Sequence, residues 1–290
     1  MKVLPFTIPV PHDHSIMVQE EVLPHFYTYL HRHAEIQITW IQKGEGTLLA
    51  GNNMHVFREG EIYMIGANLP HLFKSDPAYF LADNDKEVRT VTIFFNPSGK
   101  LSALFHLPEM KNITAFITQH PSGFKVADNL YADIAKRITA IQQAGGAEQL
   151  YSFIELLNVL STMTGLQPLS SGSYAFSMTD PEGMRIASVY NYIMQNYASA
   201  LTLEEVAMQA HLTPTAFCRY FKKHTRHTLV NFINKVRVNE ACKLLVNGPS
   251  KGIAAIAYSC GFNSITNFNY VFKSITGVSP RDYVNSYSSI

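Results

Sequence analysis

Three histidines and one glutamine in the first quarter of the chain carry side chains that could bind a metal ion or a polar small molecule. His31 and His33 are separated by one residue, Gln37 follows four residues later, and His71 ends the segment GANLPH. Three imidazoles alone can hold a zinc ion with one coordination position open. The neutral amide of Gln37 is a poorer cation ligand than a carboxylate, so these residues suit an organic ligand better than a metal.

Short runs rich in β-branched and aromatic residues surround these side chains between residues 26 and 95. Glycine-containing turn signals at 44–46 and 51–53 separate the runs, with the spacing typical of a compact antiparallel barrel or jelly roll. Strand alternation places Gln37 on the same face as the first two histidines and Trp40 on the opposite face. We expect strands at residues 35–42, 47–50, 54–57, 61–65, 71–74 and 88–95.

Helical periodicity replaces the strand pattern after about residue 98. Apolar residues recur at helical spacing in 130–141 and again in 150–160, which predicts two amphipathic helices. The second helix has a broad apolar stripe that suits packing on a partner subunit or on the barrel. The stretch 167–180, QPLSSGSYAFSMTD, is rich in serine, glycine and proline and is expected to link two domains.

The charge is divided unevenly along the chain. Residues 1–182 contain 12 Lys and Arg against 18 Asp and Glu, a balance of −6, whereas residues 183–290 contain 11 against 4, a balance of +7. A basic C-terminal third of this kind suits binding to a polyanion such as nucleic acid.

Composition and processing signals place the chain among ordinary folded proteins, with 47% hydrophobic and 16% charged residues. No apolar run approaches the ~18 residues of a membrane span, and the proline-interrupted N-terminus lacks the apolar core of a signal peptide. Three scattered cysteines suit a reducing compartment better than a disulfide framework. We therefore expect a cytoplasmic protein with no membrane contact and no cofactor.

The C-terminal third repeats itself. Apolar and small residues in 203–212 match those in 253–262 at an offset of 50, and residues in 217–232 match those in 268–283 at an offset of 51. Each copy predicts a short helix, a tight turn and a second helix, which is a helix-turn-helix. Capping signals support these bounds: Thr202 with Glu205, Thr213 before a proline, Gly261 in the second turn and Asn263 before the last helix.

The second helix of each copy has an apolar and a polar face. Phenylalanines four residues apart, at 217 and 221 and again at 268 and 272, should point to the core. The opposite face carries small, polar and cationic side chains that can reach base edges or phosphates. The predicted DNA contacts are Thr215, Cys218, Arg219 and Lys222 in the first copy, and Ile265, Thr266, Asn269, Tyr270 and Lys273 in the second.

Residues 183–288 resemble the DNA-binding domain of the AraC family of bacterial transcription regulators. The segment IAAIAYSCGFNSITNFNYVFKSITGVSPRDYV matches the family signature over its whole length, and NKVRVNEACKLL would lie in the helix that links two helix-turn-helix units. The resemblance implies that the units enter successive major-groove segments of double-stranded DNA, about 34 Å apart. Arg226 replaces a usual glycine, and Tyr270 replaces an arginine that would be suited to reading guanine.

The same resemblance implies an N-terminal sensor barrel, dimerisation helices, a homodimer and RNA polymerase as a further partner. Residues 31–71 also resemble a cupin in which Gln37 stands at the position of a metal-binding glutamate. We expect an effector pocket that combines hydrogen-bonding groups with an aromatic face, which suits a sugar or polyol, and it comprises His31, His33, Gln37, Tyr63, Asn68 and His71. His12 and His14 lie on a proline-rich segment that could cover this pocket or extend as a free tail.

The sequence thus predicts an α+β multidomain chain. A cupin-like barrel or jelly roll would occupy 1–97, a helical dimerisation segment 98–166, a linker 167–180 and an all-α domain with two helix-turn-helix units 181–290. The expected function is DNA-binding transcription regulation in response to a small molecule, without enzymatic activity. The alternative is a metal-dependent cupin enzyme fused to a DNA-binding module, with His31, His33 and His71 as metal ligands. A constitutive DNA-binding protein with a vestigial barrel is the third interpretation.

Overall fold

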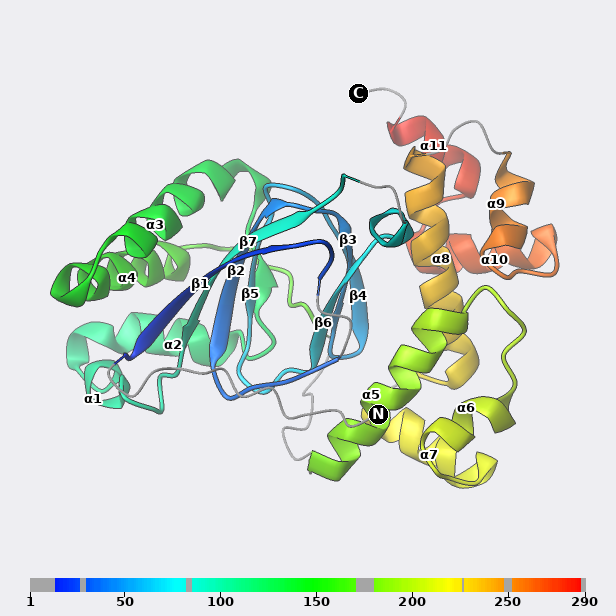
Figure 1. The fold of residues 1–290 in the computed structure, drawn as a ribbon, viewed down its shortest axis with the longest axis horizontal. Helices are drawn as coiled ribbons and strands as arrows, with labels where there is room; N and C mark the ends of the chain where they lie inside the picture. Colours follow the sequence, from blue (N-terminus) through cyan, green and yellow to red (C-terminus); the bar gives the residue numbers. More distant parts are fainter. Residues whose placement is uncertain are drawn as a thin grey trace. The chain divides into compact units, whose positions relative to one another are not determined.

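The computed structural model describes residues 14–26, 30–81, 85–170, 180–225, 227–247 and 252–287. The chain divides into two compact units, one of residues 4–178 and one that contains residues 179–290. The first combines strands with helices and the second is helical, as the ribbon in Figure 1 shows. The division falls within the stretch that the sequence predicts to be a linker.

The N-terminal unit is built on two antiparallel sheets. The larger has the strand order β1-β7-β2-β5-β8 and the smaller has the order β4-β3-β6. Six strands occur where the sequence predicts them, whereas β1 and β8 are additional. The strands are β1 (Ile16–Leu23), β2 (Ile36–Lys43), β3 (Gly46–Ala50), β4 (Asn53–Phe57), β5 (Ile62–Ile65), β6 (His71–Ser75), β7 (Val88–Phe95) and β8 (Phe124–Lys125).

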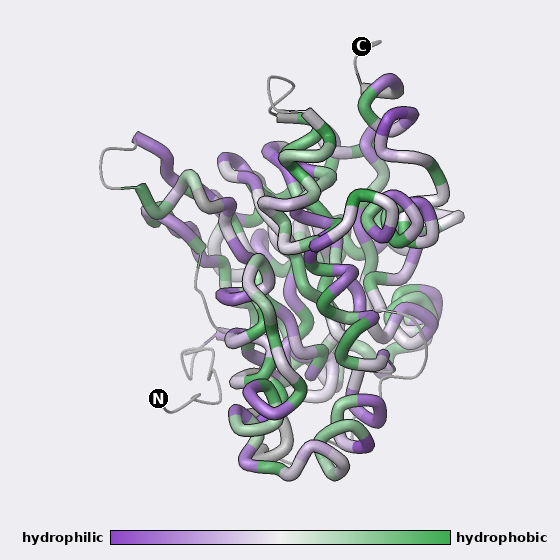
Figure 2. Tube along the Cα trace, turned by 90° about the vertical axis from the view of Figure 1, so that its right-hand side faces the viewer, coloured by the Kyte–Doolittle hydropathy of each residue, from purple (hydrophilic) through white to green (hydrophobic). Residues whose placement is uncertain are grey.

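The larger sheet has one face toward helices and one toward the smaller sheet. Because side chains alternate along a strand, Ile38 and Trp40 of β2 join the cluster beneath the helices, and Ile41 joins the apolar cluster inside the barrel. Figure 2 colours the trace by hydropathy, and apolar and polar stretches follow one another along the chain. The helices of this unit are α1 (Ser102–Phe105), α2 (Lys111–Gln119), α3 (Tyr131–Gln143) and α4 (Gly146–Ser161).

The apolar stripe of α4 packs within its own unit. Phe153 is fully buried, and its ring lies edge-on to Phe95 of β7 with centroids 4.9 Å apart. Burying side chains of this size contributes about 1.5–3 kcal/mol each, which fixes the helix on the sheet. Of the two packing partners that the stripe suits, the structure provides the sheet, and Tyr151 on another side of α4 remains exposed.

The first residues of the predicted linker belong to the barrel. Pro168 bridges to Phe124, Leu169 is buried, and the Ser170 hydroxyl donates to the Asn52 side chain over 2.6 Å. Residues 171–179 lie outside the described ranges.

The C-terminal unit contains the two predicted helix-turn-helix motifs, with α6 and α7 in the first and α9 and α10 in the second. The long helix α8 lies between them in the chain and packs against α7, α9 and α10. No helix in the described part of the chain is long and apolar enough to cross a membrane. The helices are α5 (Asp180–Asn196), α6 (Leu203–Gln209), α7 (Pro214–Thr225), α8 (Leu229–Asn247), α9 (Ile253–Ser259), α10 (Ile265–Thr276) and α11 (Pro280–Tyr287).

The capping residues agree with the sequence in the first motif and differ in the second. Thr202 and Glu205 form both hydrogen bonds of a capping box, and the Thr213 hydroxyl accepts from the Ala216 N–H at the start of α7. The N-cap of α10 is Ser264 rather than the predicted Asn263, because Ser264 has an extended backbone and its hydroxyl accepts from the Asn267 N–H.

The internal repeat has a structural counterpart in the core of each motif. The Phe217 and Phe221 rings lie 5.3 Å apart, and those of Phe268 and Phe272 lie 5.4 Å apart. All four are buried, so each second helix turns the same apolar face inward.

Candidate functional site

A cavity of about 430 Å³ opens on the inner face of the larger sheet. Its walls include β1, β2 and β7, whose pairing places Gln19 and Thr39 each opposite Thr92. A volume of this size is in the range of small-molecule sites. The lining residues are Gln19, Glu21, Leu23, Pro24, His25, Phe26, His31, Gln37, Thr39, Phe73, Thr90, Thr92 and Phe94.

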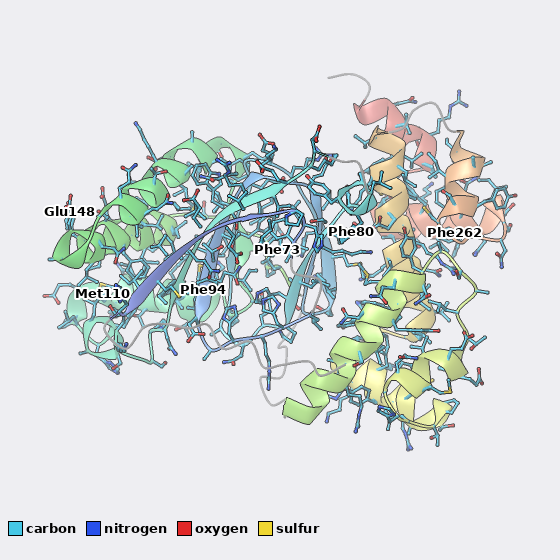
Figure 3. The ribbon with its side chains drawn as sticks, in the orientation of Figure 1. Phe73, Phe80, Phe94, Met110, Glu148 and Phe262 are labelled. Carbon is cyan, nitrogen blue, oxygen red and sulfur yellow. The ribbon has the colours of Figure 1, made fainter. Side chains whose placement is uncertain are left out.

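The lining combines hydrogen-bonding groups with aromatic rings. Hydroxyls come from Thr39, Thr90 and Thr92, and phenylalanine rings come from Phe26, Phe73 and Phe94, of which Figure 3 labels the last two. Among the described residues that line this cavity, none is a lysine or an arginine. Such a surface can bind hydroxyl groups and stack against the face of a ring, but it offers no fixed cation to an anionic ligand.

Glu21 supplies a carboxyl group to the cavity. The Gln19 amide donates to its Oε1 over 2.8 Å. Burial raises the pKa of Glu21, and the hydrogen bond from Gln19 partly opposes that rise.

A buried polar chain runs from the histidines toward Thr92. As drawn in the structure, Oε1 of the Gln37 amide lies 3.1 Å from Nε2 of His33 and 3.0 Å from Nε2 of His71. The other terminal atom lies 2.6 Å from the Thr39 hydroxyl, which is 3.1 Å from the Thr92 hydroxyl. All five side chains of this polar chain are buried, and Gln37, Thr39 and Thr92 line the cavity.

Backbone contacts fix the proton positions in this chain. Nδ1–H of His33 donates to the Glu35 carbonyl, and Nδ1–H of His71 donates to the Leu69 carbonyl, because a carbonyl only accepts. Burial lowers the pKa of both rings, so each is neutral and its Nε2 carries a lone pair.

The oxygen and nitrogen of the Gln37 amide are therefore assigned in exchanged positions, with the NH₂ group directed at both rings and the oxygen at Thr39. The opposite orientation would set three lone pairs against one another. The 2.6 Å contact with Thr39 is also the length of an O–H···O bond rather than of an N–H···O bond. In this arrangement Thr39 donates to Gln37, and every proton of the chain has an acceptor.

One ring nitrogen from each of His31, His33 and His71 lies within 4.8 Å of the other two, so these three nitrogens could hold a cation. The Gln37 NH₂ group, however, occupies the point toward which two of the Nε2 atoms are directed. The hydrogen bonds of His33 and His71 are thus complete without an ion. The donor set fits a metal-free network better than a metal centre.

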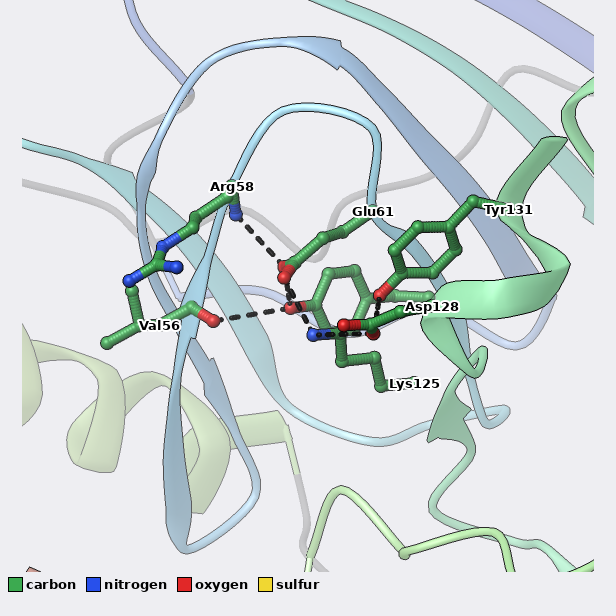
Figure 4. A network of polar contacts seen from close by, with 7 residues as sticks. Val56, Arg58, Glu61, Lys125, Asp128 and Tyr131 are labelled. Carbon is green, nitrogen blue, oxygen red and sulfur yellow. Dashed lines mark hydrogen bonds and ion pairs between the residues drawn. The ribbon is translucent and has the colours of Figure 1, made fainter. Parts of the chain in front are cut away.

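Of the six predicted pocket residues, only His31 and Gln37 line the cavity. His33 and His71 lie behind Gln37 in the buried polar chain, and Tyr63 and Asn68 lie elsewhere. Tyr63 points into the barrel, but its hydroxyl donates to Glu61 over 2.6 Å in a separate network in which Lys125 also binds Glu61 (Figure 4). Asn68 is exposed in a turn with φ of 58°, where its N–H donates to the His33 carbonyl. Neither lines the cavity.

The cavity instead includes residues that the sequence analysis did not single out. Gln19 and Glu21 lie on β1, which was not predicted, and Thr90 and Thr92 alternate along β7. The alternation of polar residues in 88–95 was the one signal that could have identified the threonines. Of the suggested covering arm, His12 is outside the described residues, and the His14 carbonyl accepts from Lys100.

The predicted DNA contacts of the first motif form one exposed face. Thr215, Cys218, Arg219 and Lys222 are exposed on α7, and Phe217 and Phe221 are buried on its other side. Arg226 lies outside the described residues.

On α10 the corresponding face is exposed apart from its first member. Thr266, Asn269, Tyr270 and Lys273 are exposed, with Tyr270 at 75%. Ile265 is partly buried and packs against the core of the second motif, so it is less available to DNA than predicted.

Comparisons with known proteins divide along the same two units. Residues 15–153 match the AraC-like ligand binding domain, and residues 206–286 match a helix-turn-helix domain. The HTH-type transcriptional regulator YdeC of Bacillus subtilis is 24% identical over 266 residues, covering 89% of this chain and 86% of the relative. The raffinose operon transcriptional regulatory protein RafR of Pediococcus pentosaceus is 23% identical over 286 residues, covering 92% and 91%. The crystal structure of ToxT from Vibrio cholerae is 14% identical, covers 95% of this chain and 99% of that one, and has a TM-score of 0.37.

Proposed function

Because this chain belongs to the AraC family of transcription regulators, we propose that it binds an uncharged, polyhydroxylated metabolite in the barrel and reads DNA with α7 and α10. A sugar or a related polyol is the chemical class that we infer. The observation that carries this proposal is the cavity lining, which among the described residues has three threonine hydroxyls, two amides and three phenylalanine rings but no lysine or arginine.

Charge separates this class from phosphorylated or acidic metabolites. Proteins bind phosphate and carboxylate groups through arginine, lysine or clustered N–H groups. The Glu21 carboxyl group would repel an anion, whereas it can accept hydrogen bonds from hydroxyls. The name of the relative RafR refers to a raffinose operon, which supports a sugar-related effector.

A thermal-shift screen tests the effector class. Neutral sugars and polyols are compared with their phosphates and with sugar acids, and the fluorescence of Trp40, the single tryptophan, reports on the barrel unit. A ligand at 100 times its Kd should stabilise the folded state by about 2.7 kcal/mol. Thr92→Val should reduce the shift, and Thr118→Val on the exposed part of α2 should not. Stabilisation by anionic metabolites alone would refute the proposal.

On the DNA side, the exposed residues of α7 and α10 divide into two roles. Arg219, Asn269 and Thr266 have donors or acceptors suited to base edges. Lys222 and Lys273 suit phosphates, and Thr215, Cys218, Tyr270 and the partly buried Ile265 would complete the contact surface. A DNA-binding regulator must share a compartment with its DNA, so we also propose a cytoplasmic location.

We propose that effector binding changes the affinity for DNA and that the regulator acts as a homodimer through α3 and α4, within residues 98–166. A ligand can shift such an equilibrium only through different affinities for two states. The exposed Tyr151 on α4 supports this choice of surface. By light scattering, Tyr151→Glu should be a monomer, whereas the control Glu148→Gln on the same helix should remain a dimer. Identical DNA affinity with and without a bound effector would refute the coupling, and transcription in vitro with RNA polymerase tests that partner.

A divalent cation held by His31, His33 and His71 is the second candidate ligand, because their nitrogens converge within 4.8 Å. Elemental analysis of protein purified without chelator tests it. Stoichiometric zinc that is lost in His71→Ala would favour the cation and would reverse the amide orientation assigned to Gln37.

A further inference from the structure

The turn of the second helix-turn-helix motif is in direct contact with the loop that precedes the first. Gly261 forms that turn, and a Cβ atom there would lie 2.8 Å from the carbonyl oxygens of both Tyr197 and Ala198. Residues 197–199 follow α5 and lead into α6 of the first motif. At this distance no side chain fits unless the backbone of one motif moves relative to the other.

The first motif provides an internal control for this contact. Its turn residue, His211, also has a positive φ, 52° against 87° for Gly261. The backbone hydrogen bonds are equivalent: His211 bonds to Met208 over 3.0 Å, and Gly261 bonds to Tyr258 over 3.0 Å. His211 nevertheless carries an exposed side chain. The glycine is therefore required by the close approach of the 197–199 loop and not by the turn alone.

Arg237 of α8 holds the two parts together. Its Nε–H donates to the Tyr197 carbonyl over 2.8 Å, and an Nη2–H donates to the Ser199 carbonyl over 3.0 Å. The guanidinium carbon lies 5.8 Å from the ring centroid of Phe262, the residue after Gly261, which Figure 3 labels. Phe262 is buried and its ring centroid is 5.1 Å from that of Phe268 on α10.

We propose that Arg237 and Gly261 set the separation and rotation of α7 and α10, and thereby determine which half-site spacing the protein accepts on DNA. This inference rests on the proposed reading of DNA by those two helices. Arg237 and Gly261 are positioning residues, since the exposed recognition faces belong to other side chains. The 197–199 loop is joined to the second motif by the bidentate guanidinium and by a backbone contact. The two motifs therefore have little freedom to move relative to each other.

A spacing series on DNA tests the proposal. The preferred operator is first selected from random DNA with the full-length chain, and one base pair is then added or removed between the two contacted segments. Each base pair moves one half-site by about 3.4 Å and rotates it by roughly 35°. The wild-type protein should lose on the order of tenfold in affinity per step, because one motif loses its base contacts.

Arg237→Ala and Gly261→Asn should flatten this profile to about threefold or less per step, with lower affinity at the original spacing. His211→Asn is the matched control, since asparagine tolerates the same positive φ without meeting a carbonyl, and it should keep the wild-type profile. Arg237→Lys can reach only one carbonyl at a time and should lie between the two. A thermal melt of each variant separates a change of spacing preference from unfolding.

A wild-type profile in a folded Arg237→Lys or Gly261→Asn protein would overturn the proposal, even if Arg237→Ala does not fold. Absence of sequence-selective binding by the wild-type chain would instead overturn the proposed function itself. A steep spacing profile for the wild type together with the same profile for the variants would overturn the positioning role alone and leave the proposed function standing.

Discussion

The Gln37 amide and the His71 imidazole lie 3.0 Å apart, with both side chains buried and the His71 ring held by the Leu69 carbonyl. A glutamine here can donate two protons, one to each of two neutral imidazoles. A carboxylate in its place would accept only, and it would need a proton or a cation between itself and the rings. The choice between glutamine and glutamate at this position is therefore a choice between a hydrogen-bonded network and a cation site.

Gln37→Glu should convert this network into a metal site. The new carboxylate and the imidazoles of His31, His33 and His71 form a donor set typical of zinc or cobalt. We expect about one equivalent of Co²⁺ by absorption spectroscopy, and in chelator a loss of about 1–3 kcal/mol in unfolding free energy from unsatisfied buried groups. Gln37→Glu combined with His33→Ala serves as the control and should lose the cobalt spectrum. Metal in the wild-type protein, or none in the variant, would contradict this account.

Acidification should destabilise the barrel unit through buried histidines. Burial lowers the pKa of His33, His55 and His71 below the usual 6.5. Below pH 6.5 the unfolded chain takes up protons that the folded chain excludes, so stability is present above that pH and is lost as pH falls toward the folded pKa values. Each group contributes a slope of about 1.4 kcal/mol per pH unit in that window.

Urea denaturation followed by Trp40 fluorescence between pH 7.5 and pH 5 measures this loss. His55→Gln tests a single group, because glutamine can replace the 2.7 Å hydrogen bond from His55 to the Leu169 carbonyl but does not titrate. The variant should take up about one proton fewer on unfolding, so its unfolding free energy should fall less steeply as pH falls. Its stability at pH 7.5 should be unchanged. A slope equal to that of the wild type would exclude His55 as a contributor.

The fold was predictable where runs of β-branched and aromatic residues are separated by glycine-containing turns, as between β2 and β6. The strand β1 was missed because its inner residues, Gln19 and Glu21, line a polar cavity, so the usual alternation of apolar and polar residues is absent. The polar inner residues that make β1 part of the candidate site also remove the alternation by which a strand is recognised in a sequence. The strand β8, with two residues, is too short for any period.

The sequence indicates which face of the barrel wall a residue of the candidate site occupies, but not its position along the barrel. Tyr63, predicted as a pocket residue, does face the barrel interior, yet its hydroxyl donates to Glu61 instead of reaching the cavity. Position along a barrel depends on the stagger between strands, which one sequence does not contain. The repeat did identify the exposed faces of α7 and α10, because helical period and burial are linked within one helix.

Tyr63→Phe should lower stability without changing effector affinity. It removes the 2.6 Å hydrogen bond to Glu61, which still accepts from Lys125 and from the Arg58 N–H. We expect a loss of about 1–3 kcal/mol, since the lost bond joins a hydroxyl to a buried carboxylate. Tyr131→Phe, which removes an exposed bond to Asp128, should cost less. A tenfold weaker effector affinity in Tyr63→Phe would place this residue in the binding site after all.

Arg219 and Lys222 should make different contributions to DNA binding, although both are exposed on α7. Arg219→Ala should lose about 1–3 kcal/mol of binding free energy on the selected operator and relax selectivity at one position, because arginine forms bidentate hydrogen bonds with a base edge. Lys222→Ala should weaken binding to all sequences and lower the slope of log affinity against log salt by about one. Lys136→Ala, an exposed lysine of α3 in the barrel unit, makes the same charge change away from the motifs and should alter neither. Affinities on operator and random DNA at several salt concentrations separate these effects, and an equal loss on both DNAs for Arg219→Ala would remove Arg219 from the base readers.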